Sequence, residues 1–244
     1  MSAAGVPGSL ALVTGAAHRL GRAIAEELAH RGYVIGLHYH SSAQAASQTA
    51  QELRAGGAQV ELLPANLTDP AQIEDLFARV DALNLPLMVL VNSAGVMARG
   101  DLRSMTVEAW DATLALNLRA PWLCARAAAI RMPAGGVIIN IIDSGIRQTW
   151  STFPAYSVSK AGLETLTRLL AKTLAPKIRV NAVAPGLIMP AETLPKEDWQ
   201  RLVERLPLKR AGSAQDIARA VSFLVESEHI TGETLVVDGG YQLL

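Results

Sequence analysis

Tyr156 and Lys160 are one helical turn apart in the segment Tyr156-Ser157-Val158-Ser159-Lys160. On a helix this spacing places a phenol and an ammonium on one face, where both can contact the same ligand. A phenol normally holds its proton to about pH 10, and a nearby ammonium favours the phenolate, which brings that proton within reach of chemistry at neutral pH. A carboxyl group, Asp143, stands thirteen residues before the tyrosine, at the end of a predicted strand. The spacing predicts a proton-transfer site, although a Tyr-x-x-x-Lys pair taken alone also occurs on ordinary half-exposed helices.

A second segment with chemical potential follows the first predicted strand and runs from Thr14 to Gly21, just before a helix. Its glycines and small residues allow the backbone to approach a pyrophosphate, which then lies at the helix N-terminus. The spacing differs from G-x-G-x-x-G, so a plain tight turn between strand and helix is the alternative.

The elements that must position these residues alternate along the whole chain between short apolar runs and helical patterns. The predicted strands are Leu10–Thr14, Val34–Tyr39, Gln59–Leu63, Leu87–Asn92, Gly136–Ile142, Arg179–Ala184 and Thr234–Val237. The predicted helices are Gly21–Arg31, Ala43–Ala55, Pro70–Ala82, Val107–Ile130, Ala155–Leu174 and Ala214–Leu224. Several strands are apolar on both faces, which is typical of a parallel sheet covered by helices. We predict an α/β fold: a single Rossmann-type doubly wound parallel sheet of about seven strands, with helices on both faces.

The pattern contains no linker or internal repeat, so we predict one domain over residues 1–244. One stretch, residues 187–212, is irregular apart from a short helical patch around Asp198–Arg205. It follows the carboxyl end of a strand, where such sheets bind ligands, and it is the candidate lid over the substrate.

Composition narrows the partners and the compartment. The 22 Lys and Arg residues balance 22 Asp and Glu residues, and no block of like charge stands out. This argues against nucleic acid or an anionic membrane surface as the main partner. The single cysteine, Cys124, excludes an intrachain disulfide and fits a reducing compartment. With no signal-peptide pattern and no membrane-spanning run, we expect a soluble, cytoplasmic protein.

Six short segments together have the order of a known family. They are Thr14–Gly21, Asn92-Ser93-Ala94-Gly95, Asn117, Tyr156 with Lys160, Pro185-Gly186 and Asp238-Gly239-Gly240. They resemble the T-G-x-x-x-G-x-G, N-x-A-G, helix asparagine, Ser-Tyr-Lys, P-G and D-G-G motifs of short-chain dehydrogenases/reductases, over essentially the whole chain. The resemblance implies a nicotinamide cofactor, a Rossmann domain and usually a homotetramer.

Two positions depart from the family pattern. Arg19 stands at the middle glycine, and Asp143 stands at the catalytic serine. Both departures resemble pteridine reductases, whose T-G-A-A-x-R-L-G turn and L-H-Y-H strand end are similar to TGAAHRLG and to Leu37–His40 here. The stacking aromatic that this subfamily commonly carries after its N-A-S-x segment is Val96 in this chain. Met97 or Trp150 could cover a ring instead.

The end of the second strand favours NADPH as cofactor. NAD-binding members place a carboxylate there, whereas this chain has His40, Ser41 and Ser42, with no acid before Glu52. Arg19, the hydroxyls and the imidazole supply positive charge and donors for a 2′-phosphate. Pteridine reductases usually have an arginine at the position of Ser41. The cofactor-binding residues implied by the resemblance are Gly15, Arg19, Leu20, Gly21, His40, Ser41, Ser42, Asn66, Leu67, Asn92, Ala94, Gly95, Tyr156, Lys160, Pro185, Gly186 and Ile188.

By the same resemblance, Tyr156 is the proton donor, Lys160 holds the nicotinamide ribose and lowers the pKa of the phenol, and Asn117 supports a proton-relay water. Asn66 stands where the family's aspartate meets the adenine amino group, and its amide oxygen can accept that bond. An ionised Asp143 can only accept a hydrogen bond, and a carboxylate beside Tyr156 raises the pKa of the phenol. Asp143 therefore either holds a proton or accepts from an N–H-rich substrate such as a pterin. The alternative is that Ser144 takes its place.

Three functions compete on this sequence. An NADPH-dependent reductase of dihydropteridine C=N bonds is favoured by Asp143 and Arg19. A carbonyl reductase acting on ketones or 3-oxoacyl thioesters is favoured by the small Val96 and the N-S-A-G segment. A cofactor-binding regulator without turnover would be expected to lose Tyr156 or Lys160, and both are present. His38 and His40 lie two residues apart, but no third ligand has metal spacing, so no metal site is predicted.

Overall fold

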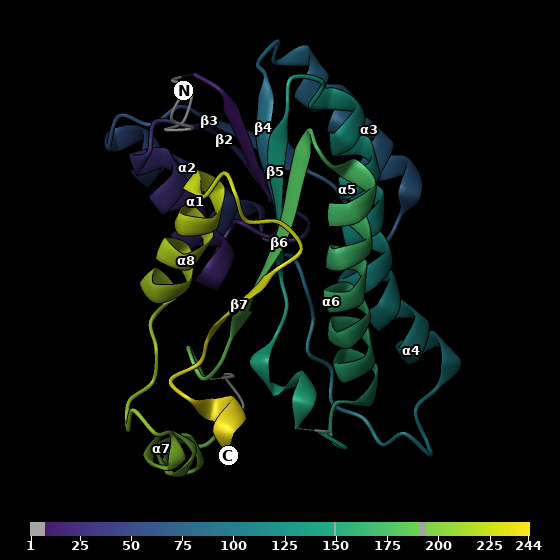
Figure 1. Ribbon diagram of the computed structural model, residues 1–244, viewed down its shortest axis with the longest axis vertical. Coiled ribbons are helices and arrows are strands. Elements are labelled where there is room, and N and C mark those ends of the chain that lie inside the picture. Colours follow the sequence, from purple (N-terminus) through teal and green to yellow (C-terminus); the bar gives the residue numbers. More distant parts are fainter. Residues whose placement is uncertain (1–7, 149, 191–193) are drawn as a thin grey trace.

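The computed structural model describes residues 8–148, 150–190 and 194–244. Seven parallel strands form one sheet in the order β3-β2-β1-β4-β5-β6-β7 (Figure 1). The strands are β1 Leu10–Val13, β2 Val34–Tyr39, β3 Val60–Pro64, β4 Leu87–Asn92, β5 Gly136–Ile141, β6 Ile178–Pro185 and β7 Thr234–Val237. The predicted doubly wound sheet is confirmed, and all seven predicted strands occur within one or two residues of their expected ends.

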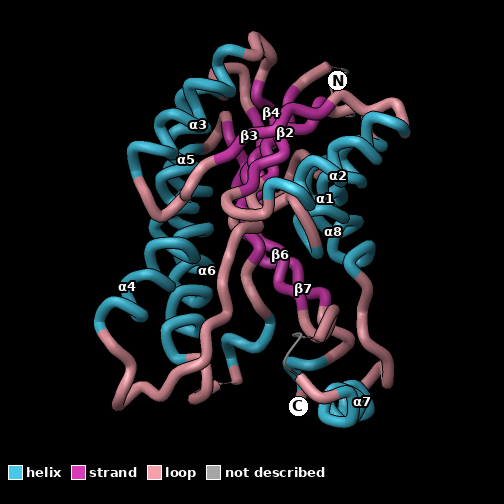
Figure 2. The backbone as a smooth tube through the Cα atoms, turned by 180° about the vertical axis from the view of Figure 1, so that it is seen from behind, coloured by secondary structure: helices cyan, strands magenta, loops and turns pink. Residues whose placement is uncertain are grey.

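Helices cover both faces of this sheet. One layer holds α1 (Arg19–His30), α2 (Ala43–Ala55) and α8 (Ala214–Glu226), and the other holds α3 (Pro70–Ala82), α5 (Ala120–Arg131) and α6 (Pro154–Leu174). Figure 2 shows the same two layers from behind, with α4 (Val107–Leu114) beside α6. Side chains of β1 alternate between the layers: Ala11 and Val13 pack with α1 and α8, whereas Leu10 and Leu12 pack with α3 and α5. This double burial explains why the strands are apolar on both faces.

One predicted helix is divided in the structure. The expected helix Val107–Ile130 consists of α4, a π-helical turn over Ala115–Arg119, and α5. Pro121 has no N–H to donate to the carbonyl of Asn117, so the regular hydrogen-bond ladder is interrupted at this point. A π turn in a helix is typical of functional sites, and this one contains Asn117.

The predicted lid, residues 187–212, contains α7 (Lys196–Arg205), somewhat longer than the expected patch. Residues 191–193 of this stretch lie outside the described residues. Helix α7 lies below the carboxyl end of the sheet in Figure 1, near the C-terminus of the chain. None of the described helices is long and apolar enough to cross a membrane.

Candidate active site

A cavity of about 1130 Å³ opens at the carboxyl ends of the strands. It is lined by the turn after β1, the ends of β2 and β3, and the segments that follow β4, β5, β6 and β7. The strand order reverses between β1 and β4, and the crevice beside such a switch point is where doubly wound sheets bind ligands.

The turn after β1 leaves no room for side chains at two glycines. Gly15 has a φ of 65°, and a Cβ there would lie 2.9 Å from the Cα of Ala94. A Cβ on Gly21 would lie 2.2 Å from the carbonyl oxygen of Gly15. The hydroxyl of Thr14 accepts hydrogen bonds from the N–H groups of Ser93 and Ala94, both at 3.0 Å, so the turn and the segment after β4 are held together. The backbone is thereby bare and fixed where a pyrophosphate would approach.

Arg19 adopts the left-handed conformation, with a φ of 54°, where the family pattern has glycine. Its exposed guanidinium donates to the carbonyl of Pro190 at 3.4 Å, across the mouth of the cavity. A bond this long and exposed is weak. The guanidinium can therefore leave this carbonyl and bind an anionic ligand with little loss of free energy.

His38 braces this end of the cavity. Its Nδ1 accepts from the N–H of Gly15 at 3.1 Å, and its Nε2 lies 3.0 Å from the carbonyl of Ala65, which fixes the tautomer with the proton on Nε2. Burial lowers the pKa of His38 to about 4. This structural role of His38 was not predicted from the sequence, where it was part of the L-H-Y-H resemblance and no metal site was expected; both ring nitrogens are occupied by the backbone.

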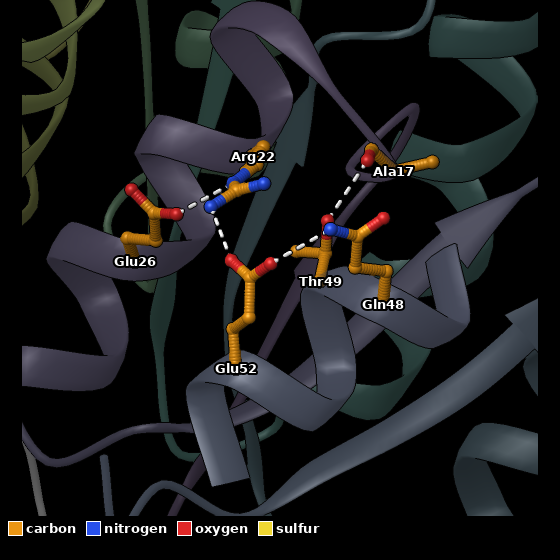
Figure 3. A network of polar contacts seen from close by, with 6 residues as sticks. All are labelled: Ala17, Arg22, Glu26, Gln48, Thr49 and Glu52. Atoms are coloured by element: carbon orange, nitrogen blue, oxygen red, sulfur yellow. Dashed lines mark hydrogen bonds and ion pairs between the residues drawn. The ribbon is translucent and has the colours of Figure 1, made fainter. Parts of the chain in front are cut away.

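A polar network connects α1 with α2 near the end of β2 (Figure 3). It binds the first acid that follows this strand in the sequence. Thr49 donates to the carbonyl of Ala17 at 3.0 Å, which ties α2 to the turn after β1. Glu52, the first acid after β2, accepts from Arg22 at 2.5 Å and from Gln48 at 3.1 Å. It therefore does not line the cavity. His40, Ser41 and Ser42 do line it, and they present donors in place of a carboxylate.

Asn66 and Leu67, after β3, also line the cavity. The amide oxygen of Asn66 accepts from the N–H of Thr68 at 3.0 Å and from its hydroxyl at 2.8 Å. Both lone pairs of that oxygen are thus occupied within the loop, which differs from the expected acceptor role toward an adenine amino group.

The chemical end of the cavity is centred on a short hydrogen bond between Tyr156 and Asp143, two residues that the sequence predicted to lie close together. The hydroxyl of Tyr156 donates to Oδ2 of Asp143 at 2.6 Å, and Oδ1 of Asp143 accepts from the N–H of Gly145 at 2.7 Å. Burial raises the pKa of Tyr156 well above its usual value, and the neighbouring Asp143 raises it further. Burial also raises the pKa of Asp143. Tyr156 is therefore a neutral phenol that holds its proton against a carboxyl group.

Lys160 differs from the expectation. Its ammonium donates to the carbonyl of Ile141 at 2.7 Å and lies 5.9 Å from the ring centre of Tyr156. Burial lowers the pKa of Lys160 to about 8. The predicted lowering of the phenol pKa by Lys160 is not found, because burial and Asp143 dominate at Tyr156.

Asn117 does not line the cavity but supports its wall from behind. Its Oδ1 accepts from the N–H of Val96 at 2.9 Å, and its Nδ2 donates to the carbonyl of Val96 at 2.8 Å and to Ser159 at 3.1 Å. Asn117 therefore fixes the segment after β4 against α6. Asn92, a predicted cofactor residue, is also absent from the described lining; its amide donates to Asn140 at 2.9 Å inside the sheet.

One wall of the cavity is aromatic, and most of it was not predicted from the sequence. Trp150, Phe153, Trp199 and Tyr241 line the cavity, and of these only Trp150 was considered. The ring centre of Trp150 lies 6.2 Å from that of Phe153 and 6.1 Å from that of Tyr241. A Cβ on Gly145 would lie 2.2 Å from the indole of Trp150, so the ring packs directly on bare backbone. The residues come from three separate segments, and only the fold brings them together.

Comparison with known proteins gives concordant results. A family model described as enoyl-(acyl carrier protein) reductase matches residues 15–242. The NADPH-dependent aldehyde reductase-like protein of Arabidopsis thaliana is 34% identical, with 96% of this chain and 94% of that protein covered. The 3-oxoacyl-acyl-carrier-protein reductase of Staphylococcus aureus is 35% identical, with 94% and 96% covered. The crystal structure of FolM alternative dihydrofolate reductase 1 from Brucella canis, complexed with NADP, has a TM-score of 0.94 at 33% identity, with 99% of this chain and 97% of that chain covered.

The chain belongs to the short-chain dehydrogenase/reductase family. The predicted enzyme class, an NADP-dependent oxidoreductase of this family, is confirmed. The turn at Gly15 and Gly21 fits a nicotinamide dinucleotide, since both glycines line the cavity and their lack of side chains lets the backbone pack tightly and stay bare toward it. Apart from Asn92 and Asn117, every residue predicted for the site of this short-chain reductase lies on the cavity wall.

Proposed function

We propose that this short-chain reductase transfers a hydride from NADPH to the C=N bond of a dihydropteridine or a related heterocycle. The observation that carries the proposal is the 2.6 Å contact between the hydroxyl of Tyr156 and the carboxyl group of Asp143. The family's usual serine donates to a substrate carbonyl. An acceptor in that place suits a substrate that itself carries N–H groups.

The residues have separate roles in this proposal. NADPH, when bound, supplies the hydride. Tyr156 gives its proton to the ring nitrogen of the substrate. Asp143 either accepts, as a carboxylate, from ring N–H groups, or, as a carboxylic acid, gives its own proton to the phenolate that remains and takes up another from water. Lys160, which is buried beside Gly95 and Tyr156, holds the nicotinamide ribose. The turn after β1 holds the pyrophosphate, and Arg19 with Ser41 and Ser42 holds the 2′-phosphate.

The aromatic wall supports a flat substrate. Trp150, Phe153, Trp199 and Tyr241 line the cavity beyond Asp143 and Tyr156, and stacked aromatic contacts are worth about 0.5–1.5 kcal/mol each beyond the area they bury. The ring expected after the N-x-A-G segment is absent because Val96 stands there, and the wall offers other rings that can cover a pterin.

Reduction of a ketone is the second candidate. It is supported by the likeness to a 3-oxoacyl-acyl-carrier-protein reductase and to an NADPH-dependent aldehyde reductase-like protein. Ser144 follows Asp143, and among the described residues its buried hydroxyl has no hydrogen-bond partner. A hydroxyl in that state is available to a carbonyl if the segment after β5 shifts.

The test compares the two substrate classes in one variant. We would measure kcat/KM for a dihydropteridine and for an activated ketone, in the wild type and in Asp143→Ser. The proposal requires Asp143→Ser to lose dihydropteridine activity, with Asp101→Ser, an exposed acid outside the cavity, as the control. A wild type inert toward every pteridine, with Asp143→Ser improved on ketones, would establish the carbonyl reductase instead.

We also propose that the enzyme works as a homotetramer in the cytoplasm, with a small molecule as its substrate. Exposed apolar side chains on α4, α5 and α6, namely Val107, Trp122, Val158 and Leu169, support assembly of copies through these helices. Light scattering during gel filtration would measure the mass, and a monomer at micromolar concentration would contradict this assembly.

A further inference from the structure

Arg99 stands out among the arginines of the chain because it faces the substrate end of the cavity with no acid beside it. It lies on the cavity wall, and its guanidinium stacks 5.3 Å over the ring of Phe153. Among the described residues, no carboxylate lies within ion-pair distance of it. Arg103, four residues later, is by contrast tied to Asp101 at 2.9 Å. An arginine left without a carboxylate at a cavity rim is available to an anionic ligand.

The backbone that carries Arg99 is held on both sides. Asn117 pins Val96 through the N–H and the carbonyl, at 2.9 and 2.8 Å. The N–H of Gly100 donates to the carbonyl of Thr152 at 3.0 Å, next to Phe153. The backbone at Arg99 is therefore held by the fold, and a ligand has to order only the side chain, which already stacks on Phe153.

The charged side chains on the cavity wall lie in three separate places. Arg19 belongs to the cofactor end, and Lys160 and Asp143 lie deep beside Tyr156. Arg99 is exposed and stacks on Phe153, whereas Tyr156 and Lys160 are buried. A ligand that reaches from Tyr156 along the rings meets an acceptor first and a cation last.

We propose that Arg99 determines specificity by binding a carboxylate that the substrate carries at the end remote from the reduced bond. The substrate class is then a flat, N–H-bearing ring with an anionic side chain, and the guanidinium fork matches the two carboxylate oxygens. This inference rests on the proposed function for the ring, but the carboxylate contact itself would serve a ketone equally well.

The experiment measures binding, so it does not depend on turnover. Isothermal titration calorimetry of the enzyme with NADP⁺ would compare folate with biopterin, and 4-acetylbenzoate with acetophenone. In each pair only the first member has a carboxylate. We expect the anionic member to bind more tightly, and Arg99→Gln to reduce that preference about 1.5- to fivefold, the range for an exposed charge pair. Arg99→Lys should keep part of it.

Arg103→Gln is the matched control, because this arginine is exposed, paired with Asp101 and outside the cavity. It should leave both preferences intact, and added salt should weaken them in the wild type. A preference in the ketone pair with no pteridine binding would overturn the proposed function and keep the role of Arg99. Equal affinities within both pairs, or a preference that Arg99→Gln leaves unchanged, would overturn the role of Arg99.

Discussion

At the scale of single residues, the contact between Tyr156 and Asp143 sets the chemistry. Burial and the carboxyl group both raise the pKa of Tyr156, so the phenol is an acid that keeps its proton until a substrate takes it. Lys160 is occupied by the carbonyl of Ile141 at 2.7 Å in the structure. Its contribution to the phenol therefore depends on how a bound cofactor redirects it.

Tyr156→Phe removes the proton donor without removing the ring. We expect kcat to fall at least about a hundredfold, the usual scale for the loss of a general acid. The affinity for NADPH, measured by fluorescence titration, should stay nearly the same, because the variant loses one hydroxyl while the other cofactor-binding residues remain. A variant that retains most of its kcat would exclude Tyr156 as the donor.

The contacts of these residues could be predicted where the partners lie at a known spacing in the sequence. The 13-residue spacing brought Asp143 and Tyr156 together correctly, since it follows the strand-to-helix pattern of the family. The carbonyl that binds Lys160 and the aromatic partners of Trp150 could not be predicted. They depend on backbone positions and on rings that lie far apart in the sequence.

At the scale of elements, the sequence predicted helix ends well where a capping residue and the helical periodicity indicated the same boundary. Helix α3 begins at Pro70 as predicted, because Asp69 caps it by accepting from Ala71 at 3.0 Å and proline suits the first turn. The π turn at Ala115–Arg119 was missed. The π turn arises because Pro121 interrupts the hydrogen-bond ladder while the helix continues along the sheet. The sequence alone does not reveal that the helix continues past this proline.

The π turn presents Asn117, and Asn117→Ala tests what it supports. The variant removes the side-chain partner of the N–H and the carbonyl of Val96, which should cost about 1–3 kcal/mol of unfolding free energy for the two hydrogen bonds. Because Val96 lines the cavity, the KM of the substrate should rise more than the Kd of NADPH. Thr113→Ala, whose hydroxyl bonds only within its own helix, is the control. A loss of stability with an unchanged KM would show that Asn117 stabilises the fold without positioning the substrate.

His38 links the turn after β1 to the end of β3, and it makes this link sensitive to acid. Its pKa is lowered from 6.5 to about 4, so the unfolded chain binds more protons between these values and stability falls as the pH drops through that window. Between pH 7.5 and pH 5 the loss should be about 2 kcal/mol, fully recovered above pH 6.5.

Urea unfolding of wild type and His38→Gln at both pH values would measure this loss. The variant should be less stable at pH 7.5 yet lose about 2 kcal/mol less on acidification. His229→Gln changes an exposed histidine and should behave like the wild type. An equal acid loss in wild type and His38→Gln would show that other groups govern the acid sensitivity.

At the scale of the whole molecule, the cavity connects segments from all seven strands, from the turn after β1 to Tyr241 after β7. A ligand that fills the cofactor end therefore contacts both halves of the sheet at once. Such a ligand binds the folded chain alone, so its affinity adds directly to the free energy of unfolding.

This linkage turns cofactor choice into a stability measurement. If NADP⁺ is present at a hundred times its Kd, unfolding should become about 2.7 kcal/mol harder. NAD⁺ at the same concentration should give about 1.4 kcal/mol or less, because Glu52 is held by Arg22 and only His40, Ser41 and Ser42 face the ribose. Arg19→Ala should close most of that gap by removing the charge that faces a 2′-phosphate, whereas Arg103→Ala should preserve it. Denaturation with each cofactor measures the difference, and a larger effect of NAD⁺ on the wild type would contradict the assignment of the residues after β2 to a phosphate.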